Sequence, residues 1–233
     1  ELLQPSRWET WLASLPRQCG NWPEWKEAEL LLAQKGPPHF FKAAADAARK
    51  LPAYYKQLRE VIPNSVIASL DDKAPFRRSM AILFSRRFGI TCREEKVTVC
   101  VPLADMLNHS SLGANLQVQF EESSARMKFV MTRDVEAGDE LLFSYGSYDN
   151  LDFCTNHGFV VPGNSLDVVN LEGVELRRGL AMPTSKTLLE RSLASLPPAA
   201  EDESVATSTA SSPGCRAIAR WRLDYRDLLQ EVL

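Results

Sequence analysis

The spacing of apolar residues changes near residue 88, and this change limits the chain to a fold that mixes helices with strands. Before residue 88, apolar side chains recur at intervals of three or four, as Trp8, Trp11 and Leu15 do, which is typical of amphipathic helices. After it, apolar and polar residues alternate, which is the period of a half-buried strand. The sequence therefore predicts an α+β fold, with helices first and small antiparallel sheets in the middle.

Helices are expected in three stretches ahead of the strands. The first holds the tryptophans, which we interpret as core anchors. The second runs over 39–61 and should break at Pro52, because proline lacks the N–H that an inner helical position donates. The third runs over 76–88, and its apolar residues share one face: Phe76, Met80, Leu83, Phe84 and Phe88.

The strands are expected where apolar residues alternate with polar or small ones. Residues 121–125 form a plausible hairpin connection, and 136–139 form a turn into a further strand over 140–145. The alternating positions are Val97, Val99 and Val101, then Leu116, Val118 and Phe120, then Met127, Phe129 and Met131.

The last third predicts two helices, and the final one needs a partner surface. A helix is expected over 177–196 and another over 215–233. Between them, residues 197–214 are rich in Pro, Ala, Ser, Thr and acids, which favours a mobile loop.

Composition excludes several classes of protein. The 45% hydrophobic content is ordinary for a globular protein, and 27 basic against 30 acidic residues leave a net charge of −3, so no global field favours nucleic acid or an anionic membrane. No apolar run approaches the roughly 20 residues that span a bilayer, and the five cysteines lack paired spacing. We expect a soluble, intracellular monomer with reduced thiols and no metal site, in chloroplast, cytoplasm or nucleus without distinction.

The most specific pattern lies between residues 101 and 146. A lone His109 is more often a core histidine, and a lone Tyr145 an ordinary strand aromatic. Here they belong to an ordered set: Val-Pro-Leu-Ala-Asp-Met-Leu-Asn-His-Ser at 101–110, Asn-Leu at 115–116, and Gly-Asp-Glu-Leu-Leu-Phe-Ser-Tyr-Gly at 138–146.

This ordered set resembles the SET family of protein methyltransferases. The Pro-Leu-Ala-Asp before Asn-His-Ser, the Ser-Arg-Arg-Phe at 85–88 and the Gly-Phe-Val at 158–160 are similar to one subfamily, which includes Rubisco large-subunit methyltransferase-like and actin-histidine methyltransferase-like proteins. The resemblance implies small β sheets preceded by a helical insertion (1–84), the C-terminal half of the SET core (85–170), and the start of a helical substrate-binding domain (171–233).

The resemblance also implies roles for five residues. Tyr145 would be catalytic, and Arg86, Asn108 and His109 would bind S-adenosylmethionine. Arg86 and Asp105 would help to bind the acceptor on a protein substrate. Methyl transfer is an in-line displacement, so positioning of the reacting atoms is most of what such residues contribute.

The chain departs from the family in one respect, because it contains no Gly-x-Gly sequence. The resemblance then implies that the N-terminal SET strands are missing and that this chain is catalytically incomplete. The function we expect is S-adenosylmethionine-dependent protein-lysine N-methylation of a non-histone protein. The alternatives are protein-histidine N-methylation and a non-catalytic, SET-like protein-binding module.

Overall fold

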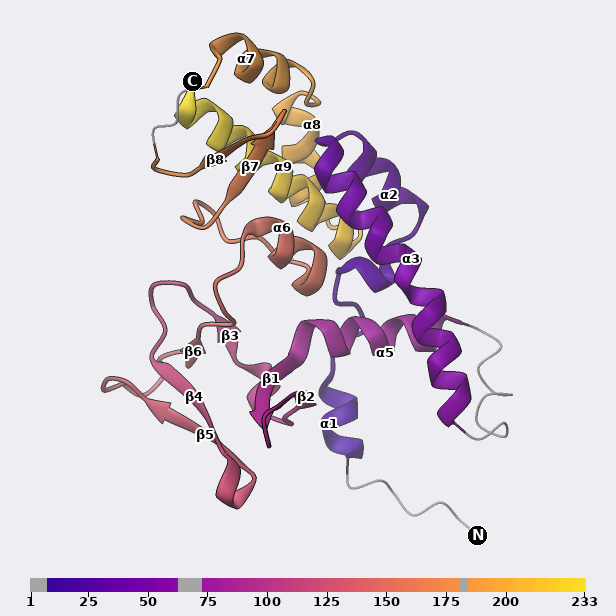
Figure 1. Cartoon of the computed structure of the whole chain (residues 1–233), viewed down its shortest axis with the longest axis vertical. Helices are drawn as coiled ribbons and strands as arrows, with labels where there is room; N and C mark the ends of the chain where they lie inside the picture. Colours follow the sequence, from indigo (N-terminus) through magenta and orange to yellow (C-terminus); the bar gives the residue numbers. More distant parts are fainter. Residues whose placement is uncertain (1–7, 63–72, 181–183) are drawn as a thin grey trace. The chain divides into compact units, whose positions relative to one another are not determined.

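The computed structural model describes residues 8–62, 73–180 and 184–233 (Figure 1). These residues fold into two compact units. We call residues 8–15 with 86–147 the β unit. The described residues of 16–85 and 148–233 form the helical unit.

The β unit contains one short helix and two sheets. Helix α1 (Glu9–Ser14) comes first. Strands β1 (Arg87–Cys92) and β2 (Glu95–Cys100) form an antiparallel hairpin. The second sheet has the order β3-β6-β4-β5, built from β3 (Asn108–His109), β4 (Leu116–Glu121), β5 (Arg126–Met131) and β6 (Leu142–Phe143).

The second sheet is mixed, which sequence periodicity does not reveal. Strands β4 and β5 are the expected antiparallel hairpin, turning through Glu122–Ser124. Strand β6, however, runs parallel to both β3 and β4. The two sheets share a core around Phe88, Leu116 and Phe143. The rings of Phe88 and Phe143 stack with centroids 5.5 Å apart.

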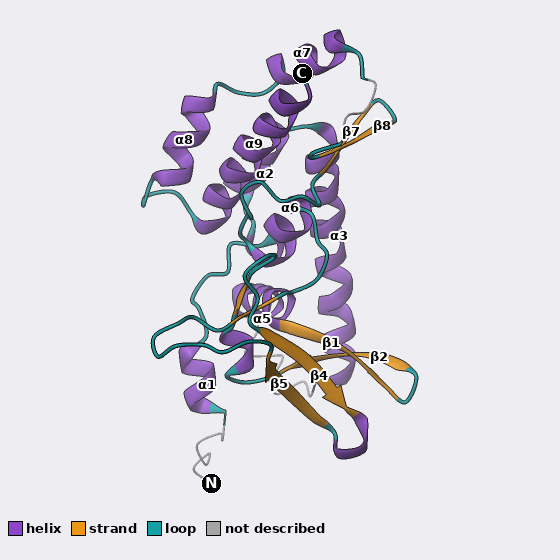
Figure 2. Ribbon diagram, turned by 90° about the vertical axis from the view of Figure 1, so that its left-hand side faces the viewer, coloured by secondary structure: helices purple, strands orange, loops and turns teal. Residues whose placement is uncertain are grey.

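The helical unit packs around its last helix, α9 (Pro213–Val232). Figure 2 shows α2 and α8 beside α9. The ring of Trp221 in α9 stacks on the rings of Phe40 and Tyr225, with ring centroids 4.3 Å and 5.1 Å apart, respectively. The other elements are α2 (Glu27–Gln34), α3 (Pro38–Val61), α5 (Lys73–Arg86), α6 (Asn150–Asp152), the hairpin β7 (Val168–Leu171) and β8 (Val174–Arg177), α7 (Lys186–Ala194) and α8 (Ala199–Thr207).

The α+β class, the central strands and the final helix are confirmed, while two expectations about the first helices are wrong. Helix α3 continues through Pro52, whose side chain is exposed. Helix α5 ends at Arg86, and Phe88 lies in β1, because its ring completes the β-unit core. Of the expected core anchors, Trp22 and Trp25 are buried, but Trp8 is 43% exposed.

Two expectations about the last third also differ from the structure. The helix expected from 177 begins at Lys186, since Val174–Arg177 is strand β8; residues 181–183 lie outside the described residues. The loop expected over 197–214 contains helix α8. The α8 segment folds because Ala206 and Asp202 are buried, and the Asp202 carboxylate pairs with Arg222 of α9.

Candidate functional site

Two segments of the β unit meet where β3 and β6 pair. Asn108 lies opposite Leu142, and His109 opposite Phe143. The N–H of Ser110 donates to the carbonyl of Phe143 at 3.1 Å. The Asn-His-Ser element is therefore fixed beside the strand that leads into Tyr145.

Asn115 holds this junction together from inside the sheet. Its side chain is buried, and its Oδ1 accepts from the N–H of Leu142 at 2.8 Å. Its Nδ2 donates to the carbonyl of Glu140 at 2.9 Å. The Glu140 carboxylate in turn accepts from Nδ2 of Asn108 at 2.6 Å. These bonds fix the Gly-Asp-Glu turn against β3 and β4.

Tyr145 is held at both its backbone and its hydroxyl. Its O–H donates to the carbonyl of Leu107 at 2.7 Å, and its N–H donates to Nδ1 of His109 at 3.0 Å. Because Nδ1 accepts, the proton of a neutral His109 ring lies on Nε2, which is 2.9 Å from Oγ of Ser111. Burial raises the pKa of Tyr145 and lowers the pKa of His109. Both side chains are therefore neutral near pH 7.

Arg86 and Asp105 form a second group in the same unit. Nη1 of Arg86 donates to the backbone carbonyl of Asp105 at 2.6 Å and lies 3.7 Å from its Oδ2. That Oδ2 also accepts from the indole Nε1 of Trp11 at 3.0 Å. The Asp105 side chain is fully buried. Leu103, two residues earlier, has a φ of +72°, which sets the tight turn that aims Asp105 inward.

Two buried polar atoms of this group have no partner in the described part of the chain: Nε of Arg86 and Oδ1 of Asp105. Buried polar atoms without hydrogen bonds are rare in folded proteins, because each costs free energy. One is a donor and the other an acceptor, so a bound polar molecule with both kinds of group would satisfy them. Other buried atoms of the described residues also lack a partner, among them Nε of Arg178 and Nε of Arg222, so that a ligand binds at Arg86 and Asp105 stays a prediction.

The structure brings all five predicted site residues into the β unit. Arg86 and Asp105 also affect the pKa of Tyr145 electrostatically, in opposite directions, after the larger effect of burial. Arg86 and Asp105 likewise act on the half-buried thiol of Cys100, whose pKa is raised chiefly by burial. Tyr145 therefore lies within electrostatic range of Arg86 and Asp105. The roles of the five individual residues stay predictions.

Sequence reasoning missed two partners of these residues. The sequence predicts Trp11 only as a core anchor, yet its indole N–H donates to the carboxylate of Asp105, which lies far along the chain. Glu140 was recognised only as part of the Gly-Asp-Glu turn, and its bond to Asn108 was not expected. No local sequence pattern predicts either contact, because each contact joins segments that are distant in the sequence.

Cys154 and His157 belong to the helical unit. Cys154 is fully buried in its core, and that burial raises the pKa of its thiol. The described residues contain no group of three or more His, Cys, Asp or Glu side chains arranged to hold a metal ion.

Within the described residues, every helix is too short or too polar to cross a lipid bilayer.

Comparison with known proteins identifies the family. The model of the SET domain matches residues 16–146, which is more than half of the chain. Actin-histidine N-methyltransferases of Rattus norvegicus and Danio rerio are each 25% identical over 174 residues, or 72% of this chain. The chain spans only 29% of the length of these relatives.

Solved structures show the same fold. The SET domain of LSMT bound to lysine and AdoHcy matches with a TM-score of 0.65 and 15% identity, over 98% of this chain and 70% of that one. Rubisco LSMT bound to AdoMet matches with a TM-score of 0.63 and 14% identity, over 97% and 69%. The resemblance drawn from the sequence is confirmed, and the chain belongs to the SET domain family.

Proposed function

We propose that this chain is part of an S-adenosylmethionine-dependent protein methyltransferase that acts on lysine. The observation that carries the proposal is the buried, unpartnered donor and acceptor of Arg86 and Asp105 beside the neutral hydroxyl of Tyr145. Membership of the SET domain family and the cofactors in the related LSMT structures support it. In this proposal residues 1–84, 85–170 and 171–233 keep the parts assigned to them from the sequence.

The residues present fit the cofactor. S-adenosylmethionine would supply a methyl group on a sulfonium centre, together with amino, carboxylate, ribose and adenine groups that need hydrogen bonds. Arg86 offers an unused buried N–H, and the β3 segment offers Asn108 and His109.

The acceptor side of the site favours a cationic substrate group. A lysine has a pKa near 10.4, so making it a neutral nucleophile at pH 7 costs about 4 to 5 kcal/mol. The buried carboxylate of Asp105 attracts the ammonium to the site, and the hydroxyl oxygen of Tyr145 is a hydrogen-bond acceptor toward which the amine can orient. These residues position the nitrogen; the transfer itself needs no covalent step from the protein.

A histidine acceptor is the second candidate. The curated relatives described above are named actin-histidine N-methyltransferases. Imidazole has a pKa near 6.5, so it needs little deprotonation at neutral pH. Mass spectrometry of the modified peptide separates the two acceptors directly.

Substitution of Tyr145 tests the activity. In the full-length protein, Tyr145→Phe should lower label transfer from methyl-labelled cofactor by about 100-fold or more, as expected when a positioning group at the reacting atoms is lost. Tyr55→Phe on α3 removes a hydroxyl of the helical unit and should leave transfer unchanged. Undiminished transfer by Tyr145→Phe would refute the assignment.

Calorimetric titration with S-adenosylhomocysteine gives a readout that does not depend on activity. The wild-type protein and Tyr145→Phe should both bind it, whereas Arg86→Ala should bind about tenfold more weakly or worse. Absence of binding to the wild-type protein would favour the non-catalytic, SET-like module instead.

A further inference from the structure

The helical unit contains a cavity of about 460 Å³ that none of the five predicted site residues lines. Its walls come from residues 17–29, from the first described turn of α5 and from the start of α9. The volume lies within the range of about 300 to 1,000 Å³ typical of ligand pockets. Nothing in the proposed methyl transfer uses it.

The acidic side chains of the wall, Glu24 and Glu29, both accept hydrogen bonds from nearby groups. Glu24 accepts from the backbone N–H groups of Cys19 at 2.7 Å and Gly20 at 3.0 Å. Glu29 is buried, accepts from the N–H of Lys26 at 2.9 Å, and also accepts from the hydroxyl of Ser212. Their negative charges therefore stabilise the loop and the helix starts that form the wall.

The basic side chains are not balanced in this way. Arg17, Lys26, Arg77 and Arg78 line the cavity, and none of them makes an ion pair with a described residue. Arg77 donates to the carbonyl oxygens of Pro23 at 2.9 Å and Trp25 at 2.6 Å. Those bonds fix its guanidinium in place but leave its charge uncompensated, in a chain whose net charge is −3.

Apolar side chains form part of the remaining wall. Trp25, Pro75 and Pro213 contribute to it. A Cβ on Gly214 would lie 3.0 Å from atoms of Trp25 and Glu29, so the start of α9 fits closely against the wall. Cations around a recess attract anions more strongly than the same cations on a flat surface. Arg77 is partly buried here, and Arg17, Lys26 and Arg78 are exposed.

We infer that this cavity binds an acidic segment of the substrate protein, with two or more Asp or Glu side chains. Charge complementarity supports this occupant, because four cations on two separate stretches of chain, residues 17–29 and the start of α5, line the cavity against two acids. The inference rests on the proposed function, which supplies a protein as substrate. It adds a recognition site in the helical unit to the reacting site of the β unit.

Fluorescence anisotropy with a labelled peptide of alternating Glu and Ser tests the inference, and the same peptide with Gln in place of Glu is the matched probe. The wild-type protein should bind the Glu peptide about tenfold or more tightly than the Gln peptide, and added salt should weaken binding. The double variant Arg17→Glu with Lys26→Glu should lose about tenfold or more in affinity for the Glu peptide.

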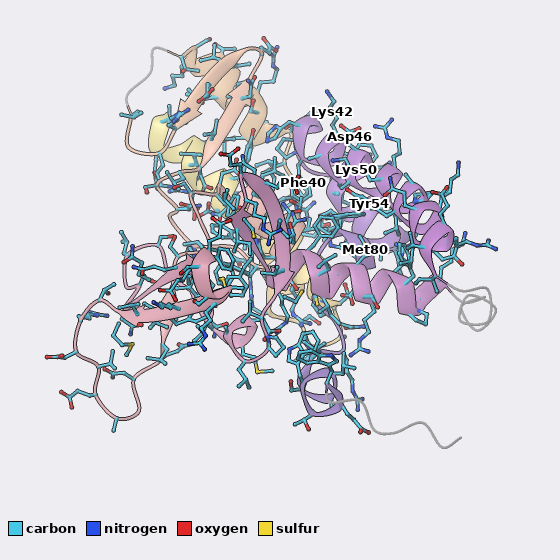
Figure 3. All side chains as sticks on the ribbon, turned by 60° about the horizontal axis from the view of Figure 1, so that its bottom comes forward. Phe40, Lys42, Asp46, Lys50, Tyr54 and Met80 are labelled. Atoms are coloured by element: carbon cyan, nitrogen blue, oxygen red, sulfur yellow. The ribbon has the colours of Figure 1, made fainter. Side chains whose placement is uncertain are left out.

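Lys42→Glu with Lys50→Glu is the charge-matched control. Both lysines are exposed on α3, do not line the cavity, and are labelled in Figure 3. Each double variant lowers the net charge by four, so a global effect would weaken binding equally in both. Equal weakening, equal affinity for the two peptides, or preferential binding of inorganic phosphate over the Glu peptide would overturn the inference.

The test separates the two proposals, because it is run without cofactor. Protein that transfers methyl groups but does not bind the Glu peptide would overturn the acidic-segment site alone. Protein that binds the Glu peptide, and in which Arg17→Glu with Lys26→Glu weakens that binding, but that transfers no methyl group would overturn the proposed activity alone.

Discussion

At the scale of single residues, Gly158 has a backbone conformation and a neighbour that only glycine tolerates. Its φ is +78°, and a Cβ there would lie 2.1 Å from the carbonyl oxygen of Cys19. Because backbone cannot shift cheaply, Gly158→Ala should lower the free energy of unfolding by about 3 kcal/mol or more, measured by urea denaturation.

Gly173→Ala is the control for that prediction. Gly173 has a similar φ of +87°, but no described atom lies within 4 Å of the added Cβ. Only the backbone conformation is then penalised, so the loss should be about 1 kcal/mol. Equal losses for Gly158→Ala and Gly173→Ala would show that the contact with Cys19 is not the cause.

Trp11 stabilises the buried carboxylate of Asp105 through one hydrogen bond. Trp11→Phe keeps an aromatic ring but removes the donor, so it should cost about 1 to 3 kcal/mol in the free energy of unfolding. Trp8→Phe changes a neighbouring indole that is 43% exposed and should cost less than about 0.5 kcal/mol. Urea denaturation of both variants checks this; a Trp8→Phe loss as large as that of Trp11→Phe contradicts it.

At the scale of elements, one buried ion pair joins α8 to α9. The side chains of Asp202 and Arg222 are at most 1% exposed, and Arg222 also donates to the carbonyl of Leu32 at 3.1 Å. Removing one partner leaves a buried charge, so Arg222→Ala should destabilise the protein by about 3 to 5 kcal/mol in guanidinium denaturation.

Two further variants distinguish the cost of leaving a buried charge unpaired from the cost of losing an ion pair. Asp202→Leu with Arg222→Met removes both charges and should cost less than Arg222→Ala alone. Lys35→Ala breaks the exposed pair with Glu201 and should cost less than about 1 kcal/mol. A double variant less stable than Arg222→Ala would refute this account of how α8 is held.

The same ion pair explains why α8 was not predicted from sequence. Its apolar residues are three alanines and one valine, and the residues it buries are Asp202 and Ala206, so periodicity gives no signal. Hairpin β7–β8 is a different case, because Val169 and Leu171 alternate before a turn at Glu172-Gly173. The β7–β8 sequence does carry the alternating pattern of a strand hairpin, and the helix predicted from residue 177 begins only at Lys186.

At the scale of the whole molecule, the order of the motif residues predicted the family correctly, whereas periodicity misplaced some of the helices. Arg86, Asp105, Asn108, His109 and Tyr145 all lie in the β unit. The order of motif residues indicates which segments of the chain meet in the fold. It does not indicate the hydrogen-bond partners of those residues, because these partners are side chains from other segments.

Stability of the whole chain should depend on pH through a buried acidic cluster in the helical unit. Asn150 donates to the carboxylates of Asp167 and Asp224, which lie near Arg178. Burial, and next the hydrogen bond with Asp224, raise the pKa of Asp167 to about 8, although Arg178 opposes the shift. An unfolded aspartate has a pKa near 3.9. Between about pH 4 and pH 8 the folded state therefore holds a proton that the unfolded state has lost.

The sign of the effect follows from proton binding. Because the folded state binds more protons in this window, the contribution of Asp167 to stability is greatest below about pH 4 and is lost as pH rises toward about 8, by at most about 1.4 kcal/mol per pH unit. Asp167→Asn removes the titrating group, so thermal melts at constant ionic strength should lose much of their decline between pH 5 and pH 8. Asp134→Asn removes one charge at an exposed position and should leave the decline intact. A wild-type protein that becomes more stable over this range, relative to Asp167→Asn, would show that Arg178 keeps Asp167 ionised and that the cluster is an ion pair rather than a shared proton.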